Sequence, residues 1–174
     1  MQRNDILALL RGGDRRTIGR ADEVAEIVSR ERRLFPKLIS GLWSRERLVR
    51  MRAADATEKL TRKHPELLGK YTKELMGLMN EAEEPELRWH LAVIVPRLPL
   101  NVRERKLVAA GLKRYLSDRS SMVKTFALQG LRDLARDDQQ IRAQVIEVLQ
   151  GSVKTGTPAM KARSRKLLLE LDHT

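Results

Sequence analysis

Four basic residues recur along this chain at a nearly constant spacing and could together bind phosphate groups. They are Arg50, Arg88, Lys124 and Lys161, which are separated by 38, 36 and 37 residues. A regular row of cations on a helical surface can follow a polyanion such as a nucleic acid backbone. Lysine at two of the four positions weakens bidentate recognition, because only arginine carries a planar fork of donors. The row therefore predicts phosphate contact of low specificity.

A second group of basic residues lies in the segment 11–20, which reads RGGDRRTIGR. Its glycines are typical of a loop that ends a helix. The adjacent Arg15 and Arg16 make this loop the best local candidate for contact with nucleic acid. The competing interpretation is a charged loop that is simply solvated.

Residue patterns that support catalysis or metal binding are missing from the sequence. His64, His90 and His173 have no histidine partner at helical spacing and no clustered carboxylates, which a zinc site requires. There is no G-x-S-x-G motif, and GSVKTG at 151–156 does not match the phosphate-binding loop G-x-x-x-x-G-K-[ST]. We therefore expect no metal, no cofactor and no enzymatic activity.

The charge of the chain favours a polyanionic partner, although it is unevenly distributed. The net charge is +12, with 13 Lys and Arg against 7 Asp and Glu in residues 1–52 and 15 against 8 in residues 101–174. Residues 53–100 hold 7 against 8, so the middle of the chain is nearly neutral. No uninterrupted basic stripe is expected.

The composition also predicts the compartment. The chain has no cysteine, which is typical of a reducing cytoplasm. Its first residues, MQRNDILALLRGG, are too polar for a signal peptide, and the longest apolar runs are five residues, 6–10 and 91–95. We expect a cytoplasmic protein without membrane contact.

An internal repeat places these residues on helices. The segments VRMRAADATEKL (from Val49), LRWHLAVIVPRL (from Leu87), VKTFALQGLRDL (from Val123) and MKARSRKLLLEL (from Met160) align with an apolar residue at position one, a basic residue at position two and leucine at position twelve. The period of 36 to 38 residues, with helical spacing throughout, is typical of stacked helical hairpins. We predict N-terminal helices within 1–31, the first near 4–11, and four hairpins over about 33–64, 66–98, 102–136 and 138–171, forming one domain over 1–174. Gly151 should end the helix that starts near 138. Pro96 should kink the helix over 85–98 near its C-terminal end.

The segment VRMRAADATEKL resembles the second helix of a HEAT repeat, and LSDRSSMVKTFALQGL adds the turn aspartate of that family. This resemblance to the HEAT-repeat (armadillo-type) family covers about residues 33–171. It implies an all-α fold, a right-handed α-solenoid of about four hairpins, and a scaffold that binds proteins. It also implies that the position-two cations bond turns and carbonyls between repeats. Only the third repeat carries the turn aspartate, Asp118, so a complete ladder of Asp–Arg pairs is not expected.

The second helices of the hairpins present two faces. Motif positions 1, 5, 8, 9 and 12 share one arc and form the core face, since an α-helix turns about 100° per residue. The opposite face is polar in the first repeat, where it includes Asp55 and Glu58, but apolar around Trp89 and Val93 in the second. Such a face either lies buried or binds a partner. The predicted partner-binding residues are Met51, Arg52, Trp89, His90, Val93 and Phe126.

Two functions remain open from the sequence. The first is a non-enzymatic scaffold that binds a protein or peptide on the second helices, with Trp89 as the anchor. The second is nucleic-acid binding by basic rows on a curved helical surface, for which DNA-repair glycosylases with HEAT-like repeats provide a structural precedent by resemblance. Few aromatic residues, 3% of the chain, are available to stack on bases.

Overall fold

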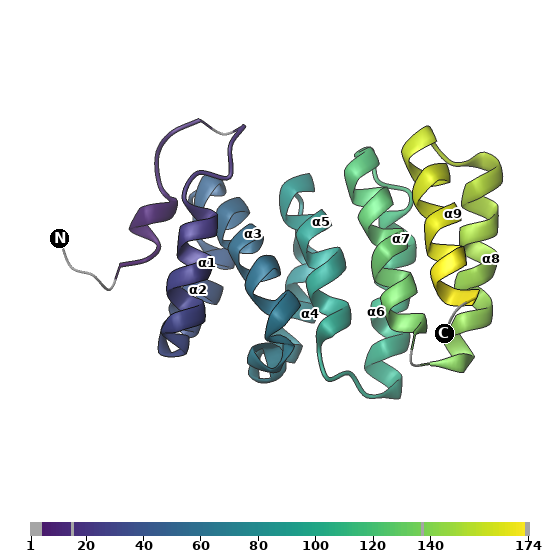
Figure 1. Cartoon of the computed structure of the whole chain (residues 1–174), viewed down its shortest axis with the longest axis horizontal. Helices are drawn as coiled ribbons and strands as arrows, with labels where there is room; N and C mark the ends of the chain where they lie inside the picture. Colours follow the sequence, from purple (N-terminus) through teal and green to yellow (C-terminus); the bar gives the residue numbers. More distant parts are fainter. Residues whose placement is uncertain (1–4, 15, 137, 173–174) are drawn as a thin grey trace. The chain divides into compact units, whose positions relative to one another are not determined.

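A computed structural model describes residues 5–14, 16–136 and 138–172 (Figure 1). Within these residues the chain forms nine α-helices and several short 3-10 helices, and no strand is present. The prediction of an all-α protein is therefore confirmed. None of the described helices has the length and hydropathy needed to cross a membrane.

The chain divides into two compact units, residues 1–70 and 71–174. The division falls inside the second predicted repeat, 66–98, and the single domain over 1–174 stays a prediction. The first unit contains α1 (Ala21–Arg30), α2 (Phe35–Ser40) and α3 (Arg47–Lys63). Its 3-10 helices are η1 (Ala8–Leu10), η2 (Arg32–Leu34) and η3 (Gly41–Trp43), followed by η4 (Pro65–Tyr71) at the division. In this unit α3 packs against α1, α2, η1 and η3, which makes it the central element.

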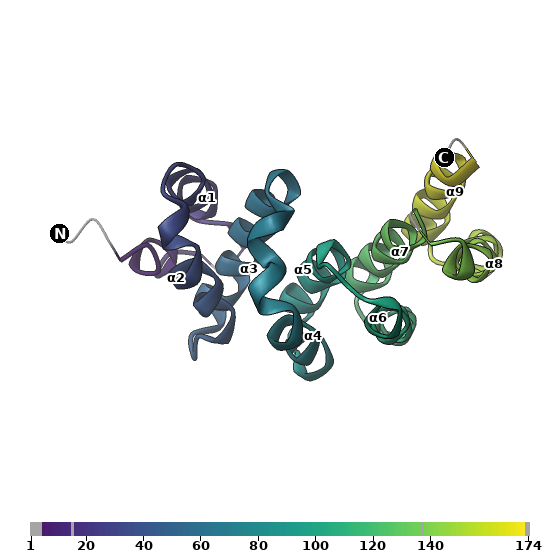
Figure 2. The ribbon, with the colours of Figure 1, turned by 90° about the horizontal axis from the view of Figure 1, so that it is seen from below.

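The second unit is built from helices that alternate between two rows. The helices α4 (Thr72–Glu81), α6 (Val102–Tyr115) and α8 (Gln139–Thr155) form one row. The other row holds α5 (Pro85–Ile94), α7 (Ser121–Ala135) and α9 (Pro158–Asp172), which lie side by side in Figures 1 and 2. Here α7 packs against α5, α6, α8 and α9, so it is the hub of this unit.

Local sequence signals explain where the helices begin. Asn101 and Glu104 form a reciprocal capping box at the start of α6. The Asp138 carboxylate accepts hydrogen bonds from two backbone amides at the start of α8. Pro85 and Pro158 open α5 and α9, where a proline has no helical hydrogen bond to lose. The helix starts are thus encoded within a few residues.

Two predicted helix boundaries are wrong. A helix near 4–11 was expected, but among its described residues only the 3-10 helix Ala8–Leu10 forms, before Gly12 and Gly13 take positive φ angles of 69° and 78°. Gly151 was expected to end the helix that starts near 138. Instead α8 continues through Gly151 to Thr155, and the next glycine, Gly156, lies at its C-terminus.

Pro96, which was expected to kink the helix over 85–98, has a clear effect. The α-helical part ends at Ile94, and Val95–Arg97 form the 3-10 helix η5. Proline cannot donate the backbone hydrogen bond that would continue the α-helix. The predicted change of helix geometry at the end of this segment is therefore present.

The core follows the predicted register. All four position-twelve leucines are buried, as are all four apolar residues at position one. The buried residues are Leu60, Leu98, Leu134 and Leu171, together with Val49, Leu87, Val123 and Met160. Burial of each such side chain contributes about 1.5–3 kcal/mol to folding. The apolar residues that recur at positions one and twelve of the sequence motif are therefore core residues.

Gly130 allows α7 to approach α5 closely. A Cβ atom at this position would lie 2.1 Å from the carbonyl oxygen of Ala92 in α5 and 3.1 Å from both Cδ atoms of Leu112 in α6. The first contact is with backbone, which cannot move aside as a flexible side chain can. The spacing of α5 and α7 therefore depends on the missing side chain.

We expect Gly130→Ala to lower the free energy of unfolding by about 2–3 kcal/mol, because α7 must move away from α5 to admit the methyl group. Urea denaturation followed by circular dichroism measures this change. Gly151→Ala is the matched control. Gly151 lies inside α8, and a Cβ atom added there would meet no other atom within 4 Å, so alanine should stabilise the protein by about 0.5–1 kcal/mol. Equal effects of the two substitutions would contradict the close-packing argument.

Candidate functional site

The structure places the predicted partner-binding residues at different depths. Met51, Trp89 and Phe126 are partly exposed, whereas Arg52, His90 and Val93 are buried at 2%, 2% and 4% exposure. The three buried residues therefore lie beneath the surface, where a partner does not reach them. On the apolar face of the 85–98 segment Val93 is buried, whereas Trp89 and Pro96 are partly exposed, so that face is only partly interior.

The second unit brings Trp89, His90 and Phe126 into one aromatic cluster. The indole of Trp89 stacks on the imidazole of His90, with ring centroids 3.5 Å apart and planes at 26°. Its centroid lies 5.1 Å from that of Phe126 in α7. The Nδ1–H group of His90 donates a 2.6 Å hydrogen bond to the carbonyl of Glu86, which fixes the imidazole. Trp89 is thus a partly exposed aromatic side chain on a rigid support.

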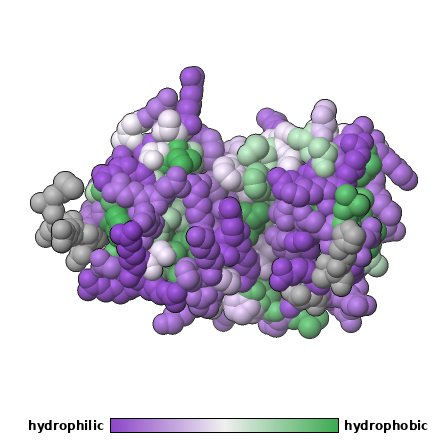
Figure 3. All heavy atoms as spheres, viewed as in Figure 1, coloured by the Kyte–Doolittle hydropathy of each residue, from purple (hydrophilic) through white to green (hydrophobic). Residues whose placement is uncertain are grey.

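The cluster continues onto α9 as a row of aromatic and basic side chains. The guanidinium of Arg163 lies 5.8 Å from the centroid of Phe126 and donates a 3.1 Å hydrogen bond to the side-chain oxygen of Gln129. The side chains of Lys124 and Lys161, both partly exposed residues, form no ion pair or hydrogen bond within the described residues. Each lysine lies two residues before Phe126 or Arg163 and therefore faces a different side of its helix. Figure 3, viewed as Figure 1, shows mostly hydrophilic residues over α7 and α9, with separate hydrophobic areas. We call Trp89, Phe126 and Arg163 the aromatic–basic row.

The two position-two arginines have a different environment from the two lysines. Arg50 donates to the carbonyl of Ser44 at 2.5 Å, and Arg88 donates to that of Ala82 at 2.7 Å, so each contacts the residue six positions before it. Arg88 also forms a 2.7 Å ion pair with Asp118, the aspartate in the turn before α7. The two carbonyl contacts join each helix to the turn before it within one predicted repeat, whereas the Arg88–Asp118 pair joins two predicted repeats. The side chains of Lys124 and Lys161 form no such contacts within the described residues.

Arg52 holds the basic loop of the first unit in place. Its guanidinium donates to four backbone carbonyls, those of Leu10 (2.9 Å), Gly12 (2.6 Å), Asp14 (3.0 Å) and Thr17 (3.3 Å). Within the described residues it has no carboxylate partner, so these carbonyl dipoles compensate the buried charge. Arg52 is therefore a structural residue of the interior, and the prediction that it contacts a partner is corrected.

The loop around Arg52 also depends on glycine. Gly19 has a φ of 54°, and a Cβ atom there would lie 2.6 Å from the guanidinium carbon of Arg52. Of the two arginines predicted to bind phosphate from this loop, Arg16 is exposed, whereas Arg15 lies outside the described residues. The loop is thus wrapped around a cation contributed by α3.

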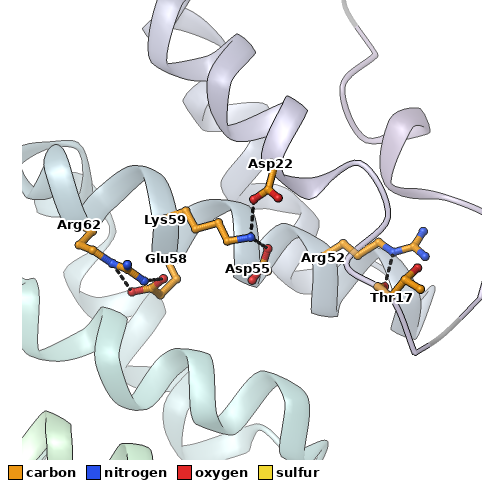
Figure 4. A network of polar contacts seen from close by, with 7 residues as sticks. All are labelled: Thr17, Asp22, Arg52, Asp55, Glu58, Lys59 and Arg62. Carbon is orange, nitrogen blue, oxygen red and sulfur yellow. Dashed lines mark hydrogen bonds and ion pairs between the residues drawn. The ribbon is translucent and has the colours of Figure 1, made fainter.

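A second polar network runs along α3 (Figure 4). Lys59 forms ion pairs with Asp22 of α1 and with Asp55, the latter at 2.7 Å, and Arg62 pairs with Glu58 at 2.6 Å. Burial alone lowers the pKa of Lys59, but its hydrogen bonds to Asp22 and Asp55 outweigh burial and raise this pKa above the ordinary 10.5. Lys59 therefore stays protonated at neutral pH and links α1 to α3.

Asp55 and Glu58 correct the sequence interpretation, which placed them on a solvent face. Both are buried, at 8% exposure each, and both are paired with cations of the same helix one turn later. A carboxylate four residues before a lysine or arginine on a helix could have indicated such pairs. Their burial could not be read from that spacing, because it depends on tertiary packing.

Arg163 is the residue that the sequence interpretation missed. It occupies motif position four, the same position as His90 and Phe126, and reading the register across all four segments would have found it.

In the described part of the chain no group of three or more His, Asp or Glu side chains could hold a metal ion. Neither a family model nor a curated protein matches this sequence.

We expect Arg52→Ala to lower the free energy of unfolding by roughly 3 kcal/mol, because it removes charge-assisted hydrogen bonds and leaves buried carbonyls unpaired. Arg52→Lys should rescue little of this loss, since an ammonium group cannot reproduce the planar fork. Thermal unfolding measures the stability, and trypsin cleavage within residues 11–20 reports release of the loop. The exposed Arg16→Ala variant serves as the control. An unchanged cleavage rate in Arg52→Ala would refute the role of Arg52 in holding the loop.

Proposed function

We propose that this chain is a non-enzymatic scaffold of the HEAT type, a right-handed α-solenoid of helical hairpins that binds a protein or peptide on its second-helix surface. The buried position-twelve leucines and the alternation of helices in two rows support the repeat architecture. The Arg88–Asp118 pair between consecutive hairpins supports the resemblance to HEAT repeats, in which such pairs are expected.

One observation carries the binding proposal, namely the partly exposed Trp89 stacked on a buried and hydrogen-bonded His90. A rigid tryptophan provides a large contact area and loses little conformational entropy on binding, which is why tryptophan is enriched among residues that dominate interfaces. Arg163, which lies over Phe126 in the same cluster, favours a partner segment that combines apolar with acidic residues. The interface is therefore proposed to consist of the aromatic–basic row.

A display experiment tests this proposal. Peptides selected from a random library on the intact protein should be rich in apolar and acidic residues, and Trp89→Ala should weaken their binding at least tenfold, about 1.4 kcal/mol. Trp43→Phe leaves Trp89 as the only tryptophan of the two in the chain, so its fluorescence reports binding directly.

Trp89→Phe, which retains an aromatic ring on His90, controls for loss of packing, and Trp43→Ala controls for loss of an exposed tryptophan elsewhere. Circular dichroism verifies that each variant is folded. Selected peptides that bind Trp89→Ala as tightly as the unmodified protein would remove this surface from consideration.

Nucleic-acid binding is a second candidate, and Lys124 and Lys161, whose side chains form no ion pair within the described residues, favour it. The two lysines lie at the same motif position on α7 and α9, which pack against each other. Cations repeated on neighbouring helices suit successive backbone phosphates. The net charge of +12 also favours binding of a polyanion such as nucleic acid.

For this candidate we expect single-stranded DNA to bind the protein at low salt and to dissociate steeply as salt approaches the physiological range. The double variant Lys124→Glu/Lys161→Glu should reduce binding at least tenfold in a gel-shift assay. Arg103→Glu/Lys106→Glu on α6 changes the net charge by the same amount and is the matched control. Equal losses in both double variants would indicate non-specific attraction, and absence of a shift at low salt would exclude the candidate.

A further inference from the structure

An open groove of about 630 Å³ lies between α8 and α9, away from the aromatic–basic row. Its lining combines the apolar side chains Val153, Leu168 and Leu169 with the polar side chains Gln150, Lys154 and Arg165. Leu169 is 61% exposed, one of the most exposed large apolar side chains in the described chain. Three apolar side chains gathered along one groove form a patch of the kind that marks interaction sites.

The repeat register explains why this groove exists. Motif positions six and nine are fully buried in the two preceding repeats, as Ala92 of α5 and Val95 of η5 and as Leu128 and Leu131 of α7. The carbonyl of Ala92 faces Gly130 of α7, the next helix in the row. The same positions in α9 are Arg165 and Leu168, which line the groove. The groove therefore lies on the side of α9 that corresponds to the side of α5 covered by α7.

We propose that this groove binds an amphipathic helix of a partner protein, with leucine-like side chains on its apolar face and Asp or Glu on both flanks. The apolar floor matches a helical stripe at positions i, i+3 or i+4 and i+7. Lys154 and Arg165 are exposed and form no ion pair within the described residues. No acidic side chain is among the described residues that line the groove, so its charge complements an acidic helix.

A second copy of this chain fits the groove poorly. A symmetric contact would place Lys154 and Arg165 of one molecule against the same residues of the other, since a two-fold interface joins identical patches. Like charges facing each other oppose such a contact. An acidic partner helix instead pairs with both cations while its apolar stripe covers Leu168 and Leu169.

The test uses a synthetic helical peptide of about 18 residues, with a leucine stripe flanked by glutamates, and a matched peptide with lysine at every glutamate position. Fluorescence polarisation should show binding of the acidic peptide and at least tenfold weaker binding of the basic one. Leu169→Glu and Lys154→Glu should each weaken binding of the acidic peptide at least tenfold. Backbone amide chemical shifts should change mainly in α8 and α9.

Matched control variants exist on α6. Leu107 is 55% exposed and lines a smaller groove that contains Glu104, so Leu107→Glu should leave binding unchanged, as should Arg103→Glu. Equal binding of the two peptides, or equal losses in the α6 variants, would overturn the proposal. Two further measurements test other occupants of the groove. Vesicles of anionic lipid test binding to a membrane surface, and light scattering of the protein alone tests self-association. Vesicle binding without peptide binding would assign the groove to a membrane surface, and dimers lost in Leu169→Glu would assign it to self-association; either result overturns the proposal.

The groove does not depend on the function proposed for the aromatic–basic row. Peptide binding that is lost in Trp89→Ala but retained in Leu169→Glu would support the row and reject the groove. The reverse pattern would support the groove and leave the row to its own test.

Discussion

The close approach of α7 to α5 at Gly130 determines most of the geometry in the second unit. Because no side chain separates Gly130 from the Ala92 carbonyl, the two helices lie near enough for contacts toward their N-terminal ends. Trp89 meets Phe126 at 5.1 Å, and Arg88 reaches Asp118 in the turn that precedes α7. A wider spacing would break the aromatic cluster and the ion pair together. The candidate surface thus depends on an interior position that no partner touches.

The internal repeat determines the position of each side chain on its helix, but the surrounding residues determine its burial and its contacts. Motif position four holds Arg52, His90, Phe126 and Arg163 in turn. Arg52 is buried beneath a loop, and His90 stacks on the indole of Trp89. Phe126 and Arg163 contact each other at the surface. A repeat therefore conserves backbone register while the chemistry of each position changes. For this reason a row of similar residues in the sequence is weak support for a shared function.

The sequence predicted the core much better than it predicted the site. The buried leucines and the helix starts follow from apolar spacing and from capping residues, both of which act within a few residues along the chain. The burial of Arg52 depends on carbonyls 35 to 42 residues earlier, and that of Asp55 and Glu58 on tertiary packing. Gly151 misled the prediction because a single glycine in an exposed helix interior costs only about 1 kcal/mol, which the rest of α8 outweighs.

The contrast between α7 and α9 shows how one register can serve two environments. Leu128 and Leu131 are buried in α7, which has helices of its own row on both sides. Their counterparts in α9 are Arg165, which is charged, and Leu168, which stays apolar. A fully apolar face at this place would be prone to aggregation, and a fully charged one could not bind an apolar stripe. The observed mixture keeps the face solvated, and it selects for a partner that brings both apolar surface and negative charge.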